Sequence, residues 1–204
     1  TATRPSVMAE YVPGRIPEDV RAAREPLQPL EITQPNGPSF TLDGNLLRWQ
    51  NWSLRVGFNH REGVTLHQIR FRDGDRERSV AHRISFAEMM VPYRDTSDDH
   101  YRRTAFDIGE WGLGFMTTSL ALGCDCLGEI RYLDATLHNS RGEPYEIPNA
   151  VCIHEEDNAV LWKHVDHDTG AEVRRMRRLT VSFHVTVANY EYLVYWRLYQ
   201  DGNI

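Results

Sequence analysis

Apolar and polar residues alternate along most of the chain between positions 39 and 199. A period of two puts the apolar side chains on one face of a strand, so the pattern predicts half-buried antiparallel strands. The expected strands are 39–42, 52–58, 64–71, 79–91, 129–138, 150–154, 160–165, 171–175, 179–187 and 192–199. Turn signals such as Asp-Gly separate several of them. The predicted fold class is therefore all-β, an antiparallel β-sandwich or part of one.

The first 36 residues differ in composition from the rest of the chain. They contain six prolines, at positions 5, 13, 17, 26, 29 and 35. Proline fixes φ and lacks a backbone donor, which excludes a long helix and leaves room only for a short one over 17–24. We expect residues 1–36 to form an extended arm or interdomain linker, followed by the sandwich from residue 37 to 204.

Residues 93–125 interrupt the strand pattern. Gly109, Gly112 and Gly114 lie within six residues of each other, which argues against a regular helix or strand. Such a stretch often brings its backbone close to another part of the molecule. Asp107 precedes these glycines and is a candidate general base, although the spacing alone favours a turn-capping role.

Charge and metal-ligand patterns exclude several functions. The net charge of -6 gives no reason to expect nucleic-acid binding. No apolar run approaches the roughly 18 residues of a membrane span, and no signal peptide is visible. His164 with His167, and the cluster at 154–157, are possible metal ligands. Because no His-x-His or Cys-x-x-Cys pair occurs, we expect no metal site made by this chain alone.

Three cysteines, Cys124, Cys126 and Cys152, allow at most one internal disulfide. Counting does not fix its partners. A hydrolase is not indicated either, because no Gly-x-Ser-x-Gly segment occurs and neither Cys124 nor Cys126 has an evident base nearby in the sequence.

Five segments, in order, resemble copper-containing primary amine oxidases, which are topaquinone enzymes. These segments are Val91-Pro92-Tyr93, 106–110, 122–128, 152–157 and 186–192. The last contains Asn189-Tyr190-Glu191, which is similar to the cofactor motif, and Asp107 precedes Tyr190 by 83 residues, as the family spacing requires. The resemblance runs from about Pro29 to the end and is nearest to bacterial phenylethylamine and histamine oxidases. It implies that the chain is the N-terminal part of the catalytic domain.

The resemblance implies the reaction of a primary amine, water and dioxygen to an aldehyde, ammonia and hydrogen peroxide. Tyr190 would be the precursor of topaquinone, which forms a Schiff base with the substrate. Asp107 would be the buried proton acceptor. Tyr93 would donate a hydrogen bond to a cofactor oxygen, and Asn189 would restrict the orientation of the ring.

Substrate preference depends on the residues that would line the channel or pocket. Our candidates are Ala105, Phe106, Trp111, Leu113 and Tyr192. Relatives often carry an aromatic residue where this chain has Ala105, so its channel should be wider. Aromatic walls favour an aryl-alkyl amine or histamine, whereas Asp98 and Asp99 would favour a diamine. We favour the former.

The family's copper ligands are three histidines downstream of the cofactor tyrosine. Only 14 residues follow Tyr190, and none is histidine. We therefore expect a sandwich that is incomplete at its C-terminus, copper ligands outside this chain, and the rest of the domain as a second chain or missing segment. The full unit is expected to be a homodimer. The resemblance also implies a Cys126–Cys152 disulfide, with Cys124 free.

Two other functions stay open. One is a catalytically inactive β-sandwich without copper that serves as a binding or structural module. The presence of both Asp107 and Tyr190 argues against it. The other is a carbohydrate-binding sandwich that uses exposed Trp52, Trp111 and Trp162, but it leaves the five ordered segments unexplained.

Overall fold

The structure is a computed structural model of the 204-residue chain. It describes residues 12–17, 27–98, 106–188 and 190–204. The chain divides into two compact units, Thr1–Leu30 and Glu31–Ile204. The described residues before Phe40 contain no strand. They contain one 3₁₀ turn, Pro13–Arg15, which begins with proline. None of the described helical segments is long and apolar enough to cross a membrane.

The first sheet contains five antiparallel strands that follow chain order. They are β1 (Phe40–Asp43), β2 (Leu46–Trp49), β3 (Trp52–Asn59), β4 (Gly63–Asp73) and β5 (Arg76–Ser85). Two of the connections are the Asp-Gly turns predicted from the sequence. Gly44 and Gly74 have φ of 56° and 60°, a left-handed conformation that glycine adopts without steric cost.

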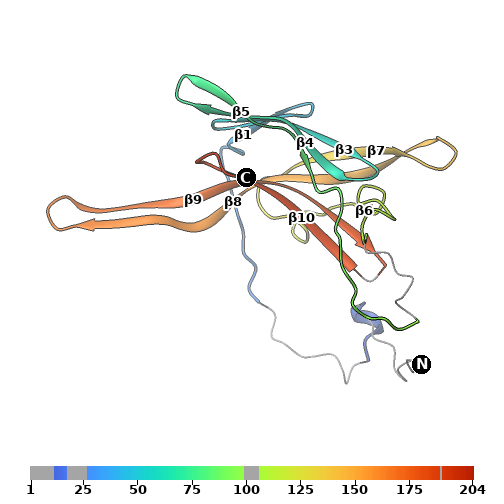
Figure 1. Cartoon of the computed structure of the whole chain (residues 1–204). Coiled ribbons are helices and arrows are strands. Elements are labelled where there is room, and N and C mark those ends of the chain that lie inside the picture. The colour runs from blue at the N-terminus through green and yellow to red at the C-terminus, as the bar shows by residue number, and fades with distance from the viewer. Residues whose placement is uncertain (1–11, 18–26, 99–105, 189) are drawn as a thin grey trace. The chain divides into compact units, whose positions relative to one another are not determined.

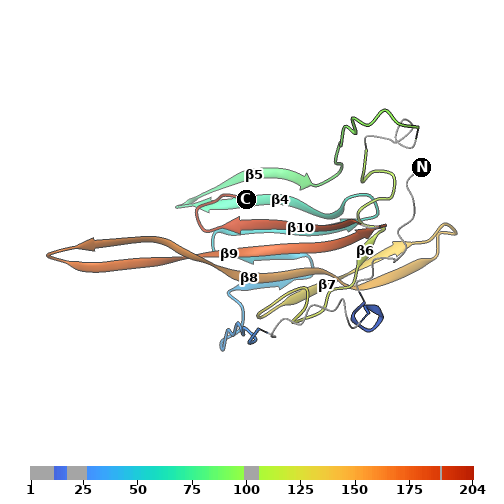
Figure 2. The ribbon, with the colours of Figure 1, turned by 90° about the horizontal axis from the view of Figure 1, so that it is seen from below.

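The second sheet has the order β10-β9-β8-β7, with β6 paired to β9. Its strands are β6 (Thr117–Thr118), β7 (Arg131–His138), β8 (Pro144–Asp166), β9 (Gly170–Val187) and β10 (Tyr190–Tyr199). Figures 1 and 2 show β8 and β9 running far beyond their neighbours as a two-stranded hairpin. All strand pairs are antiparallel, so the predicted fold class is confirmed.

The hydrophobic core combines inward-facing side chains of both sheets, as in a sandwich. Trp49 and Trp52 of the first sheet are fully buried in it. Their indole N–H groups reach the second sheet: Trp49 donates to Glu155 Oε1 at 3.1 Å, and Trp52 donates to the Tyr199 carbonyl at 2.7 Å. Trp52 is therefore a core residue, and the idea that it binds carbohydrate at the surface is wrong.

Gly63 begins β4 next to Phe183 of the other sheet. Its φ is 68°, and a Cβ added there would lie 2.2 Å from Phe183 Cε2. We expect Gly63→Ala to lower the free energy of unfolding by about 2–5 kcal/mol, because left-handed backbone strain and overpacking add. Gly74→Ala is the matched control: its φ is 60° with nothing within 4 Å, so only the strain of about 1–2 kcal/mol remains. If urea unfolding gives the same loss of free energy for both variants, the packing against Phe183 has no effect on stability.

Glu156 on β8 joins three strands of the second sheet. It accepts hydrogen bonds from His154 Nε2 at 3.2 Å and from Arg178 Nε on β9 at 2.5 Å. Arg197 Nε on β10 lies 3.7 Å away. Burial raises the pKa of the Glu156 carboxyl, but the hydrogen bonds from His154 and Arg178 outweigh burial and bring the pKa to about 2.

This depressed pKa predicts how stability depends on pH. A carboxyl of this kind stabilises the fold above its unfolded pKa of about 4.3, and the contribution is lost as pH falls toward the folded value. Glu156→Gln should therefore unfold at lower denaturant concentration than the wild type at pH 7. The difference in unfolding midpoint between the variant and the wild type should shrink as the pH falls from 5 to 2. A difference in midpoint that stays constant over this range contradicts the claim that the ion pairs of Glu156 stabilise the fold.

Candidate active site

The glycine-rich turn that follows Asp107 packs on the connection between β3 and β4. A Cβ on Gly114 would lie 1.8 Å from the Asn59 carbonyl oxygen, and one on Gly112 would lie 2.7 Å from that of His60. These glycines are therefore required by a close backbone approach, as the sequence predicted. The packing fixes the turn against the first sheet.

Glu88 anchors the same turn from its other side. Its Oε1 accepts hydrogen bonds from the backbone N–H of Gly109 at 2.9 Å, Met89 at 3.0 Å and Ile108 at 3.3 Å. Burial raises the pKa of Glu88, but these three hydrogen bonds outweigh it and the net pKa lies below the ordinary value. Sequence reasoning missed Glu88, because it lies some 20 residues upstream in a segment predicted as strand.

Tyr93 and Asp107 form a hydrogen-bonded pair. The Tyr93 hydroxyl donates to Asp107 Oδ1 at 2.9 Å and to Oδ2 at 2.7 Å. The backbone N–H of Asp107 donates to the Met89 carbonyl at 3.0 Å. Asp107 is half-buried, not buried as expected. Its carboxylate is thus fixed in direction and still reachable from solvent.

Tyr190 is the first residue of β10 and follows the tight turn between β9 and β10. It pairs with Val187, and Ala188 in the turn has φ of 52°. Such a φ is uncommon for a residue other than glycine, and here it lets the chain reverse within two residues. Tyr190 therefore lies at the end of the sheet, with 55% of the residue exposed.

Asp107 and Tyr190 meet at one pocket of about 190 Å³. The pocket is lined by Tyr93, Asp107, Glu110, Trp111, Val187, Ala188, Tyr190 and Tyr192. Its two halves come from the Asp107 turn and from the β9–β10 turn, which are far apart in sequence. Burial raises the pKa of Tyr192, and the charges of Asp107 and Tyr190 raise it further. The phenol of Tyr192 is therefore neutral at pH 7. The pocket combines carboxylates with aromatic walls.

Comparison with known proteins identifies the family. Residues 41–204 match the family described as copper amine oxidase, enzyme domain. The chain belongs to the copper amine oxidase family. It is 52% identical to the primary amine oxidase of Arthrobacter sp. (strain P1), a match that covers 98% of this chain and 30% of the relative. It is 56% identical to copper-containing diamine oxidase 1, peroxisomal, of Nicotiana tabacum, over 89% of this chain and 23% of the relative.

The fold also matches solved copper amine oxidases. The crystal structure of a copper-containing benzylamine oxidase from Hansenula polymorpha superposes with a TM-score of 0.82 and 42% identity. That match covers 91% of this chain and 29% of the benzylamine oxidase. This chain therefore spans between 23% and 30% of the length of the curated relatives named above.

The structure of the chain brings together five of the residues predicted for the site. Tyr93, Asp107, Trp111, Tyr190 and Tyr192 all line the pocket. In this structure the hydroxyl of Tyr93 contacts Asp107; the predicted contact to a cofactor oxygen stays a prediction. Glu110 and Val187 also line the pocket. The predicted site residues omitted both, although Glu110 belongs to the segment that carried the resemblance.

Other predicted wall residues lie elsewhere. Leu113 is fully buried in the core and does not line this pocket, because its backbone N–H donates to the Arg61 carbonyl and holds it beneath the turn. Phe106 is exposed, forms an isolated bridge with Met90 and is not part of the pocket wall. Ala105, Asn189 and Asp99 lie outside the described residues.

Cys126 forms a disulfide with Cys152, as the resemblance implied, and Cys124 is free and exposed. Within the described part of the chain, one group of three residues has metal-ligand chemistry: Cys126, Cys152 and His154. His164 and His167, candidates from the sequence, are not in it. The two cysteines of this group are bonded to each other, so His154 is the one member of the group left to bind a metal while the disulfide is intact.

Proposed function

We propose that this chain supplies the proton-accepting aspartate and the cofactor tyrosine of a copper-dependent primary amine oxidase. The complete protein would convert a primary amine, water and dioxygen to an aldehyde, ammonia and hydrogen peroxide. The observation that carries this proposal is the single pocket shared by Asp107 and Tyr190. Residues 37–204 would then be the N-terminal portion of the catalytic sandwich, and residues 1–36 an arm that precedes it.

Tyr190 suits conversion to topaquinone. More than half of the residue is exposed, so dioxygen can reach it from solvent. Its hydroxyl makes no hydrogen bond with the residues that the structure describes. Once formed, the quinone supplies a conjugated electron sink that makes the carbon next to the amine nitrogen acidic. We propose that the copper needed for this conversion is held by residues outside these 204, because the group of possible ligands in the described residues is occupied by a disulfide.

The residues of this chain then have defined tasks. Asp107 accepts the proton from the carbon next to the amine nitrogen. Tyr93 contacts both carboxylate oxygens and keeps them in one orientation, which lowers the entropy cost of reaching the reactive geometry. Glu88 acts at a distance, as a positioning residue that holds the backbone of the turn. Asp107 and Glu110 together give the pocket a negative charge that attracts an ammonium group.

We propose an aryl-alkyl amine, or histamine, as the substrate class. Trp111 and Tyr192 provide aromatic walls that an aromatic ring can contact. The alternative, a diamine, depended on Asp98 and Asp99. Asp98 is exposed and does not line the pocket in this structure, which supports the aromatic substrate.

The proposed substrate class is tested with the complete, copper-loaded protein. We expect kcat/KM for benzylamine or histamine to exceed that for a linear aliphatic diamine. Trp111→Ala should lower kcat/KM for the aromatic amine and leave that for methylamine within about twofold, since contact with an aromatic wall is worth about 0.5–1.5 kcal/mol or more. A preference for the diamine, or equal losses for both amines in Trp111→Ala, contradicts the assignment.

The activity itself is tested by product analysis. Amine-dependent oxygen uptake by the complete protein should release aldehyde, ammonia and hydrogen peroxide in equal amounts. Adding catalase should return half of the oxygen. If no amine tested consumes oxygen in the copper-loaded protein, the proposed function is wrong.

We further propose that the complete protein is a homodimer. The hairpin of β8 and β9 extends beyond the rest of the sheet (Figure 1). Its apolar side chains are exposed at Val160, Leu161, Trp162, Val165 and Val173. Exposed apolar groups on a paired-strand arm indicate a protein contact. Light scattering should give a dimer mass for the complete protein and a smaller mass for Trp162→Glu; a monomeric wild type contradicts the proposal.

A further inference from the structure

A second pocket, of about 380 Å³, lies beside the disulfide. It is lined by Ile32, Cys124, Asp125, Cys126, Leu127, His154, Glu156, Asp157, Tyr195 and Arg197. It has no lining residue in common with the pocket of Asp107 and Tyr190. Cys126 and His154 therefore border a pocket other than the one that Asp107 and Tyr190 line.

Three donor atoms converge at this place. The two sulfurs and one ring nitrogen of Cys126, Cys152 and His154 all lie within 4.8 Å of one another. Cys152 Sγ and His154 Nδ1 are 3.2 Å apart. Around a tetrahedral zinc ion, with Zn–S of about 2.3 Å and Zn–N of about 2.0–2.1 Å, such atoms are roughly 3.5–3.8 Å apart. The sulfur–nitrogen pair is already near this spacing, and breaking the bond between the sulfurs frees both of them to bind a cation.

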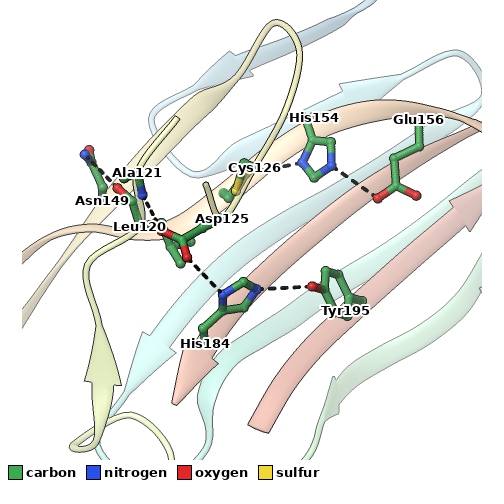
Figure 3. The surroundings of a disulfide bond; sticks show 10 residues. Leu120, Ala121, Asp125, Cys126, Asn149, His154, Glu156, His184 and Tyr195 are labelled. Carbon is green, nitrogen blue, oxygen red and sulfur yellow. Dashed lines mark hydrogen bonds and ion pairs between the residues drawn. A yellow bond between two sulfur atoms is a disulfide. The ribbon is translucent and has the colours of Figure 1, made fainter. Parts of the chain in front are cut away.

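His154 is oriented as a metal-bound histidine would be. Figure 3 shows the ring between the sulfur and the Glu156 carboxylate, with one ring nitrogen directed to each. Because Glu156 accepts the hydrogen bond from Nε2, the neutral ring directs the lone pair of Nδ1 toward sulfur. A disulfide has no proton to give to that lone pair. A carboxylate behind the imidazole is the usual second partner of a metal-bound histidine.

We propose that the reduced form of this disulfide is a binding site for one thiophilic cation, Zn²⁺ or Cu⁺, held by Cys126, Cys152 and His154. Two thiolates and one imidazole are the donors that such cations prefer. A tetrahedral cation keeps a fourth position, which water from the pocket can fill. This proposal does not depend on the proposed oxidase function.

The chemistry balances with a dithiol as the reductant. The dithiol transfers two electrons and two protons to the Cys126–Cys152 bond and becomes a disulfide itself. The two cysteine thiols release their two protons when both sulfurs bind the cation. Disulfide and metal site are thus alternative states of the same residues, and oxidation expels the cation.

The pocket connects the donor atoms with solvent. Two of its carboxylates are paired with arginines, Glu156 with Arg178 and Asp157 with Arg175. The donor atoms, and not the net charge of the wall, therefore select the cation. Cys126 and His154 are almost fully buried, yet both border this pocket, which provides a path for entry.

The test compares the reduced and the oxidised chain. The 204-residue chain, reduced with a phosphine and kept free of oxygen, is titrated with Zn²⁺ in competition with a chromophoric chelator. A second titration uses Cu⁺ with a chelator specific for that ion. We expect one ion per reduced chain in at least one titration and none in the oxidised chain. Equal binding by both forms, or none by the reduced form, overturns the proposal.

Variants assign the ligands. Cys152→Ser and His154→Ala should each weaken binding by about 100-fold or more, and Glu156→Gln by about 10–100-fold, the usual effect of losing an outer-shell partner. Cys124→Ser is the matched control and should change affinity by less than about twofold, because Cys124 is exposed and not in the donor group. Circular dichroism checks that each variant folds. If Cys124→Ser lowers affinity as much as His154→Ala, the assignment is wrong; if Cys152→Ser does not fold, the wild-type comparison still decides.

Discussion

Asp107→Asn should lower kcat by about 10²–10⁴-fold in the complete, copper-loaded protein, the usual contribution of a general base. Asparagine keeps the size of the side chain and can still accept the hydrogen bond from Tyr93. It has no basic oxygen to take the proton from the substrate. KM should change far less than kcat, because the aromatic walls of the pocket are unaltered.

The Asp107→Asn result is measured by steady-state kinetics and by trapping with phenylhydrazine. The adduct should still form on Tyr190, since Asp107 is needed for turnover and not for the presence of the cofactor. Asp98→Asn is the control, because Asp98 is exposed and outside the pocket, and it should keep full activity. More than about a tenth of wild-type kcat in Asp107→Asn contradicts its role as the base.

Tyr190→Phe should abolish amine oxidation altogether. Phenylalanine has no phenolic oxygen, so the ring cannot be oxidised to the quinone. Tyr192→Phe is the matched control, because this residue lines the same pocket and its ring centroid lies 6.5 Å from that of Tyr190. We expect Tyr192→Phe to retain the phenylhydrazine adduct and measurable turnover. An adduct in Tyr190→Phe, or its loss in Tyr192→Phe alone, places the cofactor on another residue.

The strands with one buried face were predictable from sequence, because burial imposes a period of two. β3 and β4 agree with their predicted ranges to within two residues. β2 escaped prediction, since four residues between two tight turns are too few to display a period. The β-sandwich followed from the pairing of many such strands, and the two interior tryptophans in fact hold its sheets together.

The continuity of β8 was not predictable from alternation. Residues 150–154 and 160–165 were expected as separate strands, but they belong to one strand of 23 residues. Its pairing with β9 shifts register between Asp157 and Val160, where Ala159 has φ of 67°. Such a bulge changes which face each side chain points to, so the period breaks although the strand continues.

The site was predictable only where a motif named its residues. Asp107 and Tyr190 were found through resemblance, and the structure adds that they share a pocket. No sequence signal points to Glu88, because its partners are backbone N–H groups, which are the same whatever the side chains of the turn are. Leu113 was misjudged because an apolar residue in a motif can face either a pocket or the core.

The shared pocket also bears on the inactive module considered as an alternative. A scaffold without catalysis has no need to place a half-exposed tyrosine and a fixed carboxylate at one cavity. The hydrogen bonds from Tyr93 fix the orientation of the Asp107 carboxylate, and Glu88 fixes the backbone of the turn. A module that only binds has no need of a carboxylate fixed in this way.

The mass of the peptide that contains Tyr190 tests most directly whether this chain carries the cofactor. The complete protein is loaded with copper in the presence of oxygen, treated with phenylhydrazine and digested. We predict a phenylhydrazine adduct on Tyr190 in the copper-loaded sample and an unmodified tyrosine in a sample kept free of copper. An unmodified Tyr190 in both samples would contradict the proposal that this chain carries the cofactor of an amine oxidase.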